Sequence, residues 1–198
     1  HSLTTLTTFV VSSQAIRDRF EFTQSRNTNS VRVETGFDLA PFALISGRGR
    51  VGYRRLNGDG TTPNYSGLVS SVIAGTAIKG RTHLDIATAR DVNYSLELAY
   101  PYFLQTGVAV TVTPRLTQRW DMQARVGVQR LAYRIAPGFP DLLPHRVDRY
   151  GVTGAGVGLR VGREMRVGFN VDRERRASPV QRRDYLGYRT GMSVTYGR

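Results

Sequence analysis

The alternation of apolar and polar residues is clearest between Gly151 and Asp172, where it predicts a complete β-hairpin with a tight Gly162-Arg163-Glu164 turn. Successive strand side chains point to opposite faces, so the hairpin has two chemically different faces. The first face carries Thr153, Ala155, Val157, Leu159, Val161, Met165, Val167, Phe169 and Val171. The second face carries Gly154, Gly156, Gly158, Arg160, Arg166, Gly168, Asn170 and Asp172. In a soluble sheet the apolar face would cover a core, whereas in a transmembrane barrel it would contact lipid.

Segments with strand character recur along the whole chain, with no convincing helical period between them. The pattern therefore predicts an all-β fold in which about ten antiparallel strands follow one another up and down in hairpin order. A chain of 198 residues suits a single domain of this kind. The segments are residues 3–22, 31–39, 43–55, 67–78, 81–91, 105–113, 120–133, 151–161, 165–172 and 184–198.

The connections between these segments alternate in length. Those around Pro41, Lys79, Pro114 to Arg119, and Arg163 are short. The longer and more polar ones are residues 23–30, 56–66, 93–102, 135–149 and 173–183. Outer-membrane barrels have this asymmetry, because their periplasmic turns are tight and their external loops are long. The pattern favours an antiparallel up-and-down transmembrane β-barrel over a soluble β-barrel or sandwich, with Arg163 on the periplasmic side.

The positive charge of the chain is distributed rather than clustered. The sequence has 28 basic and 15 acidic residues, a formal net charge of +13, and Lys79 as its only lysine. Nucleic-acid-binding proteins gather their basic residues on one face or arm. Arginine here recurs in almost every predicted strand, so nucleic acid is not an expected partner.

Three further observations bound the class of protein. The chain has no cysteine, which leaves neither a disulfide framework nor a thiolate metal site. No run approaches the roughly 18 apolar residues of a transmembrane helix. The chain begins at His1 without methionine or a hydrophobic signal segment, which predicts a processed or incomplete N-terminus.

Arginines and carboxylates share the polar faces of the predicted strands and are the candidate lumen-lining residues. An arginine-rich interior would favour anionic solutes or acidic glycans, since rings of Arg and Lys select anions. The alternative is that cross-strand ion pairs fill the interior, which is narrow in a barrel of about ten strands. The candidates are Arg32, Arg48, Arg50, Arg54, Arg125, Arg160, Arg166 and Arg189, with Glu34, Asp38, Asp85, Asp121 and Asp172.

The apolar faces supply the candidate lipid-facing residues, with aromatic side chains near strand ends where a barrel has its interfacial girdles. These residues are Phe37, Tyr53, Trp120, Val157, Leu159, Val167, Phe169 and Tyr196. Arg90, Arg130 and Arg173 fall on the same predicted lipid-facing side of their strands. An arginine at the midplane of a bilayer lowers stability by roughly 2 to 4 kcal/mol. The barrel interpretation therefore requires these three arginines to lie beyond the bilayer, near the external loops.

Two other features have a structural and a functional interpretation. The glycines Gly154, Gly156, Gly158 and Gly168 either open space for a ligand or accommodate large neighbours such as arginine. His83 and Asp85 share one strand face, as in outer-membrane proteases of the omptin type, but His1 and His145 lie at a terminus and in a proline-rich loop. A second catalytic pair is therefore missing, and we expect no enzyme activity, no metal and no cofactor.

Glycine, tyrosine and arginine recur at strand positions in several runs: ALISGRGRVGYRRLN, YSGLVSSV, ATARDVNYSLELAYPYFLQTGVAVTVTPRL, the Trp120-Asp121 strand ending in LAYR, GVGLRVGREMRVGFNVDRERR and the closing SVTYG. In these runs, which span most of its length, the chain resembles the β-barrel porin 2 group of Gram-negative outer-membrane proteins. Some members of the group are encoded in exopolysaccharide operons. Members are usually longer, so residues 1–198 are either one outer-membrane barrel domain or the C-terminal part of a longer barrel. The ending departs from the terminal aromatic of such barrels, because Gly197 and Arg198 follow Tyr196.

The sequence thus predicts a protein of the bacterial outer membrane with the lipid bilayer as its first partner. The expected function is a porin-like conduit, or an accessory for export of acidic polysaccharide or anionic solutes. The alternative is a non-conducting barrel that serves as a structural or interaction component of the cell envelope or of an extracellular assembly. An anionic glycan or other envelope proteins would be the further partners.

Overall fold

One antiparallel sheet contains every strand of the residues that the structure describes. The computed structural model describes residues 2–40, 44–139, 145–162 and 164–196. In these residues the strands follow one another in sequence order from β1 to β11, and no α-helix is present. Their bounds are β1 Ser2–Thr4, β2 Thr7–Asp18, β3 Thr28–Leu39, β4 Ser46–Gly58, β5 Tyr65–Ile78, β6 Thr82–Tyr94, β7 Tyr102–Pro114, β8 Trp120–Arg134, β9 Val147–Val161, β10 Met165–Ala177 and β11 Tyr185–Tyr196.

The ten long strands β2 to β11 confirm the all-β, up-and-down fold. β1 is a three-residue addition to the free edge of β2, paired through Ser2 with Thr8 and Thr4 with Thr7. The hairpin between Gly151 and Asp172 is formed by β9 and β10, with Leu159 opposite Val167 and Val157 opposite Phe169. Because the register places residues of the same face opposite one another on neighbouring strands, the apolar and charged faces continue across the sheet.

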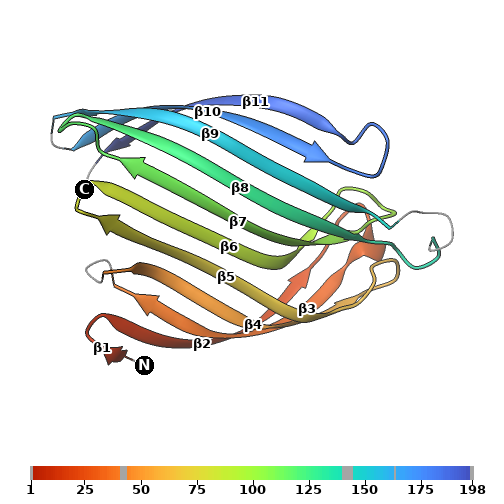
Figure 1. Ribbon diagram of the computed structural model, residues 1–198. Helices are drawn as coiled ribbons and strands as arrows, with labels where there is room; N and C mark the ends of the chain where they lie inside the picture. The colour runs from red at the N-terminus through yellow and green to blue at the C-terminus, as the bar shows by residue number, and fades with distance from the viewer. Residues whose placement is uncertain (1, 41–43, 140–144, 163, 197–198) are drawn as a thin grey trace.

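The two ends of the sheet differ in their connections (Figure 1). Residues 79–81 and 115–119 make short connections at one end, which we call the short-turn end. Residues 19–27, 59–64, 95–101 and 178–184 connect strands at the opposite end, which we call the long-loop end. A single 3-10 turn, Gln24–Arg26, lies in the first of these long connections. The predicted turn residues Pro41 and Arg163 lie outside the described part of the chain.

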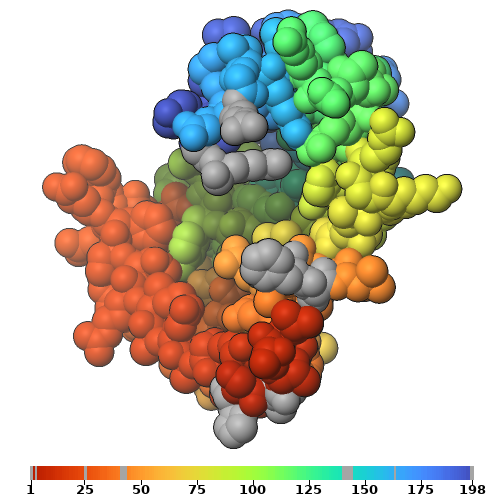
Figure 2. Space-filling model, turned by 90° about the vertical axis from the view of Figure 1, so that its left-hand side faces the viewer, coloured from red at the N-terminus to blue at the C-terminus, as the bar shows by residue number. Residues whose placement is uncertain are grey.

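The sheet is strongly curved but is not closed into a barrel. Figure 2 shows the hollow of the curved sheet from the short-turn end, with the N-terminal strands below and the C-terminal strands above. In the described residues β11 pairs only with β10, and the outer edge of β2 pairs only with the short β1. The closed barrel predicted from the sequence is therefore not formed in this structure, because these two edges do not meet.

The buried apolar cluster is small and lies at the long-loop end. It consists of Leu56, Tyr65, Val69, Val92, Tyr102 and Leu104. The ladder between β5 and β6 ends at Ser70 and Arg90, and beyond it the tip of the β6–β7 hairpin packs against the β4–β5 hairpin. There the Tyr102 hydroxyl donates a hydrogen bond of 3.1 Å to the carbonyl of Asn64. Among the described residues the middle of the sheet contains no such apolar cluster, and charged side chains are buried there instead.

Candidate functional site: the charged concave face

Charged side chains are buried on one face of the curved sheet, and apolar side chains are exposed on the other. Asp172 and Asp121 are only 1% and 2% exposed, whereas Phe169 and Val126 are both 50% exposed. The charged face is the concave one, because side chains from strands that are not neighbours meet across it. This distribution is the reverse of a soluble sheet, in which apolar residues fill the interior.

The structure places every predicted lumen-lining residue on the concave face and every predicted lipid-facing residue on the convex face. The concave set, by strand parity, is Arg32, Arg48, Arg50, Arg54, Arg125, Arg160, Arg166, Arg189, Glu34, Asp38, Asp85, Asp121 and Asp172. The convex set is Phe37, Tyr53, Trp120, Val157, Leu159, Val167, Phe169 and Tyr196. Leu159 and Val167 are half-buried, and the others are exposed.

Two of the concave ion pairs reach from β8 to β10 across the intervening strand β9. Arg125 on β8 donates from Nε to Asp172 Oδ1 on β10 at 3.2 Å, and its Nη2 forms an ion pair with the same carboxylate. In the opposite direction, Arg166 on β10 donates from Nε to Asp121 Oδ2 on β8 at 2.9 Å. Charge-assisted, two-pronged contacts of this kind are the strong ones, so they hold the three strands together.

The glycines of β9 make these contacts possible. In the register Gly154 lies between Arg125 and Asp172, and Gly158 lies opposite Asp121. A Cβ atom on Gly154 would overlap the carboxylate of Asp172, and one on Gly158 would overlap the Asp121–Arg166 pair. The geometry therefore supports the interpretation that these glycines accommodate large neighbours rather than a ligand.

A second set of ion pairs joins the N-terminal strands to β6. Asp91 on β6 accepts a hydrogen bond from Arg32 Nη2 at 2.8 Å and one from Arg54 Nη1 at 3.1 Å. Arg54 lies on β4, so its contact with Asp91 spans the intervening strand β5. Arg50 pairs with Asp38 at 2.7 Å. Most concave arginines are therefore neutralised by a carboxylate, as in the interpretation in which ion pairs fill the interior. Arg48 and Asp85 form no ion pair within the described residues.

An open cavity of about 430 Å³ lies on the concave face at the short-turn end. Its lining brings together the predicted residues His83, Asp85, Asp121, Arg160 and Arg166. Arg160 approaches Asp121 at 3.9 Å. His145 lies just before β9 at the long-loop end, which is the opposite end of the strands from this cavity. The cavity thus combines one histidine with two arginines and three carboxylates, the third being Glu164, so its lining is polar and of mixed charge.

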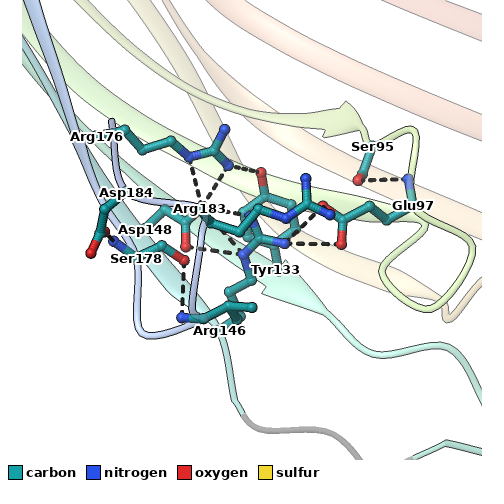
Figure 3. Close-up of polar contacts among 10 residues, drawn as sticks. Ser95, Glu97, Tyr133, Arg146, Asp148, Arg176, Ser178, Arg183 and Asp184 are labelled. Atoms are coloured by element: carbon teal, nitrogen blue, oxygen red, sulfur yellow. Dashed lines mark hydrogen bonds and ion pairs between the residues drawn. The ribbon is translucent and has the colours of Figure 1, made fainter. Parts of the chain in front are cut away.

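At the long-loop end, Arg146 is the centre of a buried charge cluster (Figure 3). Its guanidinium donates to Asp148 from Nε at 3.0 Å and from Nη2 at 2.8 Å, and to Glu97 from Nη1 at 2.9 Å. It also lies 4.1 Å from the centre of the Tyr133 ring. Arg176 donates from Nε to Asp148 at 2.9 Å, so that one buried carboxylate serves two arginines. Arg146 is 1% exposed and is the most buried arginine among the described residues.

This cluster shifts the pKa of its loop residues. Burial alone would lower the pKa of the Arg146 guanidinium, but the hydrogen bonds that it donates to Asp148 and Glu97 outweigh burial and raise that pKa. Burial raises the pKa of the neighbouring Tyr100 hydroxyl, against the opposing charge of Arg146. Arg146 is therefore permanently charged and Tyr100 stays neutral at physiological pH.

The connection between β6 and β7, residues 95–101, contacts three other long connections. Arg26 of the β2–β3 connection donates to the carbonyls of Ser95 and Pro101. Glu97 pairs with Arg146 and, at 3.2 Å, with Arg183 of the β10–β11 connection. The Ala136 amide donates to the Ala99 carbonyl at 2.9 Å. This connection is thus tied from three sides across the long-loop end of the sheet.

Sequence reasoning missed this second group of charged residues. Asp148 and Arg176 lie on the same concave face as the predicted lumen-lining residues. Had the alternating pattern of β9 and β10 been followed further toward the loops, it would have predicted both residues. Arg26, Glu97 and Arg146 lie in irregular segments, where no periodicity says which side chains meet.

No helix in the described residues is long and apolar enough to cross a membrane. The same residues contain no cluster of three or more histidine or acidic side chains that could hold a metal ion. No family model matches the chain, and neither the curated proteins nor the solved structures contain a significant match to it.

Proposed function

We propose that this sheet is the wall of a transmembrane β-barrel in the bacterial outer membrane, with its convex face in lipid. One observation carries the proposal: apolar side chains such as Phe169 are exposed on the convex face while ion-paired charges such as Asp172 are buried on the concave face. In water this arrangement would leave a large apolar surface unsatisfied. In a bilayer the same surface is favourable, and the charges face a polar interior.

The edges of the sheet impose a condition on this proposal. Unpaired backbone groups are not tolerated in the hydrocarbon region of a bilayer. The free edges of β2 and β11 are therefore expected to be paired in the membrane, either with each other or with further strands. Closure of this kind completes the wall without changing the register of the other strands.

The single tryptophan tests this proposal directly. Trp120 is exposed on the convex face, so its fluorescence is expected to shift to shorter wavelength in phosphatidylcholine vesicles and to be quenched by brominated acyl chains. A matched variant, W120F with Gln123→Trp, moves the indole to the concave face of the same strand. That variant is expected to resist quenching by lipid and to remain accessible to iodide. Equal quenching of the two proteins, or recovery of the unmodified chain without detergent, would contradict the proposal.

Within this barrel we infer a porin-like conduit for anionic solutes or acidic glycan that is restricted at the long-loop end. The connection of residues 95–101 lies across that end, tied to Arg26, Arg146 and Arg183. The cavity at the short-turn end, whose lining contains Arg160 and Arg166 together with the carboxylates Asp85, Asp121 and Glu164, would form part of the passage. The second candidate is a non-conducting structural or interaction barrel, which the pairing of most concave arginines with carboxylates favours.

Planar-bilayer conductance separates the two candidates. The unmodified chain is expected to carry little current, and replacement of residues 96–100 by Asn-Gly is expected to increase an anion-biased current severalfold, because the restricting connection is removed. A control variant, Leu96→Ser with Leu98→Ser, keeps the loop length and changes two exposed side chains, so its current should equal that of the unmodified chain. If the shortened chain inserts but carries no anion-biased current, the conduit is wrong and the non-conducting barrel is the function.

A further inference from the structure

The convex face carries arginines that have no acidic partner. Every acidic residue within β2 to β11 lies on the concave face: Asp18, Glu34, Asp38, Asp85, Asp91, Asp121, Asp148, Asp172 and Glu174. Arg130, Arg149 and Arg175 have convex parity and are exposed, and among the described residues none of them forms a hydrogen bond or ion pair. The two faces of the sheet thus differ, because most concave arginines form ion pairs and these three convex arginines do not.

These arginines form a line across neighbouring strands at the long-loop end. Arg130 on β8 lies directly opposite Arg149 on β9, and Arg175 on β10 lies opposite Gly151, diagonal to Arg149. Arg90 on β6 extends the line, since Arg90 and Arg130 both lie opposite Thr106. Like charges directly opposite one another destabilise a sheet. A cost of this kind is removed when an anion lies between the guanidinium groups.

An apolar groove of about 680 Å³ borders this line of arginines. Its lining includes Val108, Val128 and Gly151 in addition to Arg130, Arg149 and Arg175. Val108, Val128 and Gly151 lie opposite one another, one convex position closer to the middle of the sheet than Arg130 and Arg149, and Arg175 lies opposite Gly151. Charge therefore lies at the end of the groove that is nearer to the loops, and the apolar wall continues from there along the strands.

We propose that this groove binds a membrane lipid with a phosphorylated headgroup, with phosphate on Arg130, Arg149 and Arg175 and an acyl chain along Val108 and Val128. The proposal rests on the proposed membrane location. Guanidinium groups match phosphate oxygens with two parallel hydrogen bonds, and basic residues at a membrane surface attract anionic lipids. An acidic protein or glycan would match the arginines but not the apolar groove, so a lipid is the occupant that fits both parts.

Lipid A and its dephosphorylated form, which share the same acyl chains, are the probes for this site. The full chain is inserted into phosphatidylcholine nanodiscs that contain one or the other lipid, and retained lipid is measured by native mass spectrometry. The unmodified chain is expected to retain lipid A and not the dephosphorylated form. Replacement of Arg130, Arg149 and Arg175 by glutamine is expected to weaken retention of lipid A on the order of a hundredfold, because each arginine at a membrane surface contributes about 1 kcal/mol.

A charge-matched control separates this site from a general effect of net charge. Lys79→Gln with Arg81→Gln and Arg119→Gln removes three basic residues from the short turns and is expected to retain lipid A as the unmodified chain does. Equal retention of the two lipids by the unmodified chain overturns the site, whether or not the arginine variants fold, and so does an equal loss in the control variant. The site is also overturned if free inorganic phosphate prevents retention of lipid A and the chain shows no preference for lipid A over its dephosphorylated form. Insertion is followed separately by heat-modifiable gel mobility, so that a chain that fails to enter nanodiscs refutes the proposed function instead.

Discussion

Substitution of Arg146 by methionine is expected to lower the free energy of unfolding by about 3 kcal/mol. Methionine keeps much of the side-chain volume but leaves the buried carboxylate of Asp148 with Arg176 as its remaining arginine partner, and Glu97 with the exposed Arg183. A buried carboxylate that loses its best-placed arginine is destabilising, because the remaining contacts compensate less of its desolvation. Urea unfolding of the detergent-solubilised protein, followed by circular dichroism of the sheet, measures the change.

Arg134→Met is the control for this experiment. Arg134 lies at the end of β8, close in sequence to Tyr133, but its side chain is exposed and forms no ion pair with a described residue. Its substitution is expected to change the free energy of unfolding by less than about 0.5 kcal/mol. If Arg146→Met has an effect as small as this one, the cluster around Arg146 does not hold the long-loop end together.

Gly154→Val is expected to destabilise the protein by a similar amount, about 3 kcal/mol. A side chain at this position would occupy the space through which Arg125 reaches Asp172, so the buried carboxylate would be displaced and would lose its arginine. The increase in intrinsic strand preference from glycine to valine is smaller than this loss. The free energy of unfolding in urea is again the measured quantity.

The matched control is Gly151→Val on the same strand. Gly151 faces the convex side, and a Cβ atom there would approach only the Gly127 carbonyl, at 3.9 Å. This change is expected to be neutral or slightly stabilising, since valine favours strands. Equal destabilisation by Gly154→Val and Gly151→Val would show that glycine acts through the backbone of β9 and not through the space above it.

The strands and their faces could be predicted from the sequence because the period of two is long and regular. In β3, β4, β8, β9 and β10 the alternation places every carboxylate and most arginines on one face and most valines and phenylalanines on the other, although Arg55, Arg130, Arg149, Arg173 and Arg175 share the apolar face. The strand order followed from the short connections, since consecutive antiparallel strands joined in this way pair with each other. Much of the charged concave surface was thus predictable, including Asp121 and Arg166, whereas Asp91, Asp148 and Arg176 were missed.

The contacts between distant strands could not be predicted in the same way. Periodicity places Arg125 and Asp172 on one face but does not say that the curvature lets them meet across β9. The cluster around Arg146 depends on the paths of irregular connections, which follow from tertiary packing and not from local pattern. Closure of the sheet is a property of its two edges together, and no segment of the sequence encodes it alone.

The ion pairs that span β9 also bear on the shape of the wall. Each pair joins two strands that flank a third, on the concave side of the sheet, as a chord joins two points of an arc. The length of the paired side chains therefore limits how far these three strands can flatten. Arg125–Asp172 and Arg166–Asp121 are two such chords over the same three strands, donated from opposite sides. The reach of these polar side chains therefore limits the bend of this part of the sheet. A longer carboxylate side chain at either end would relax the bend.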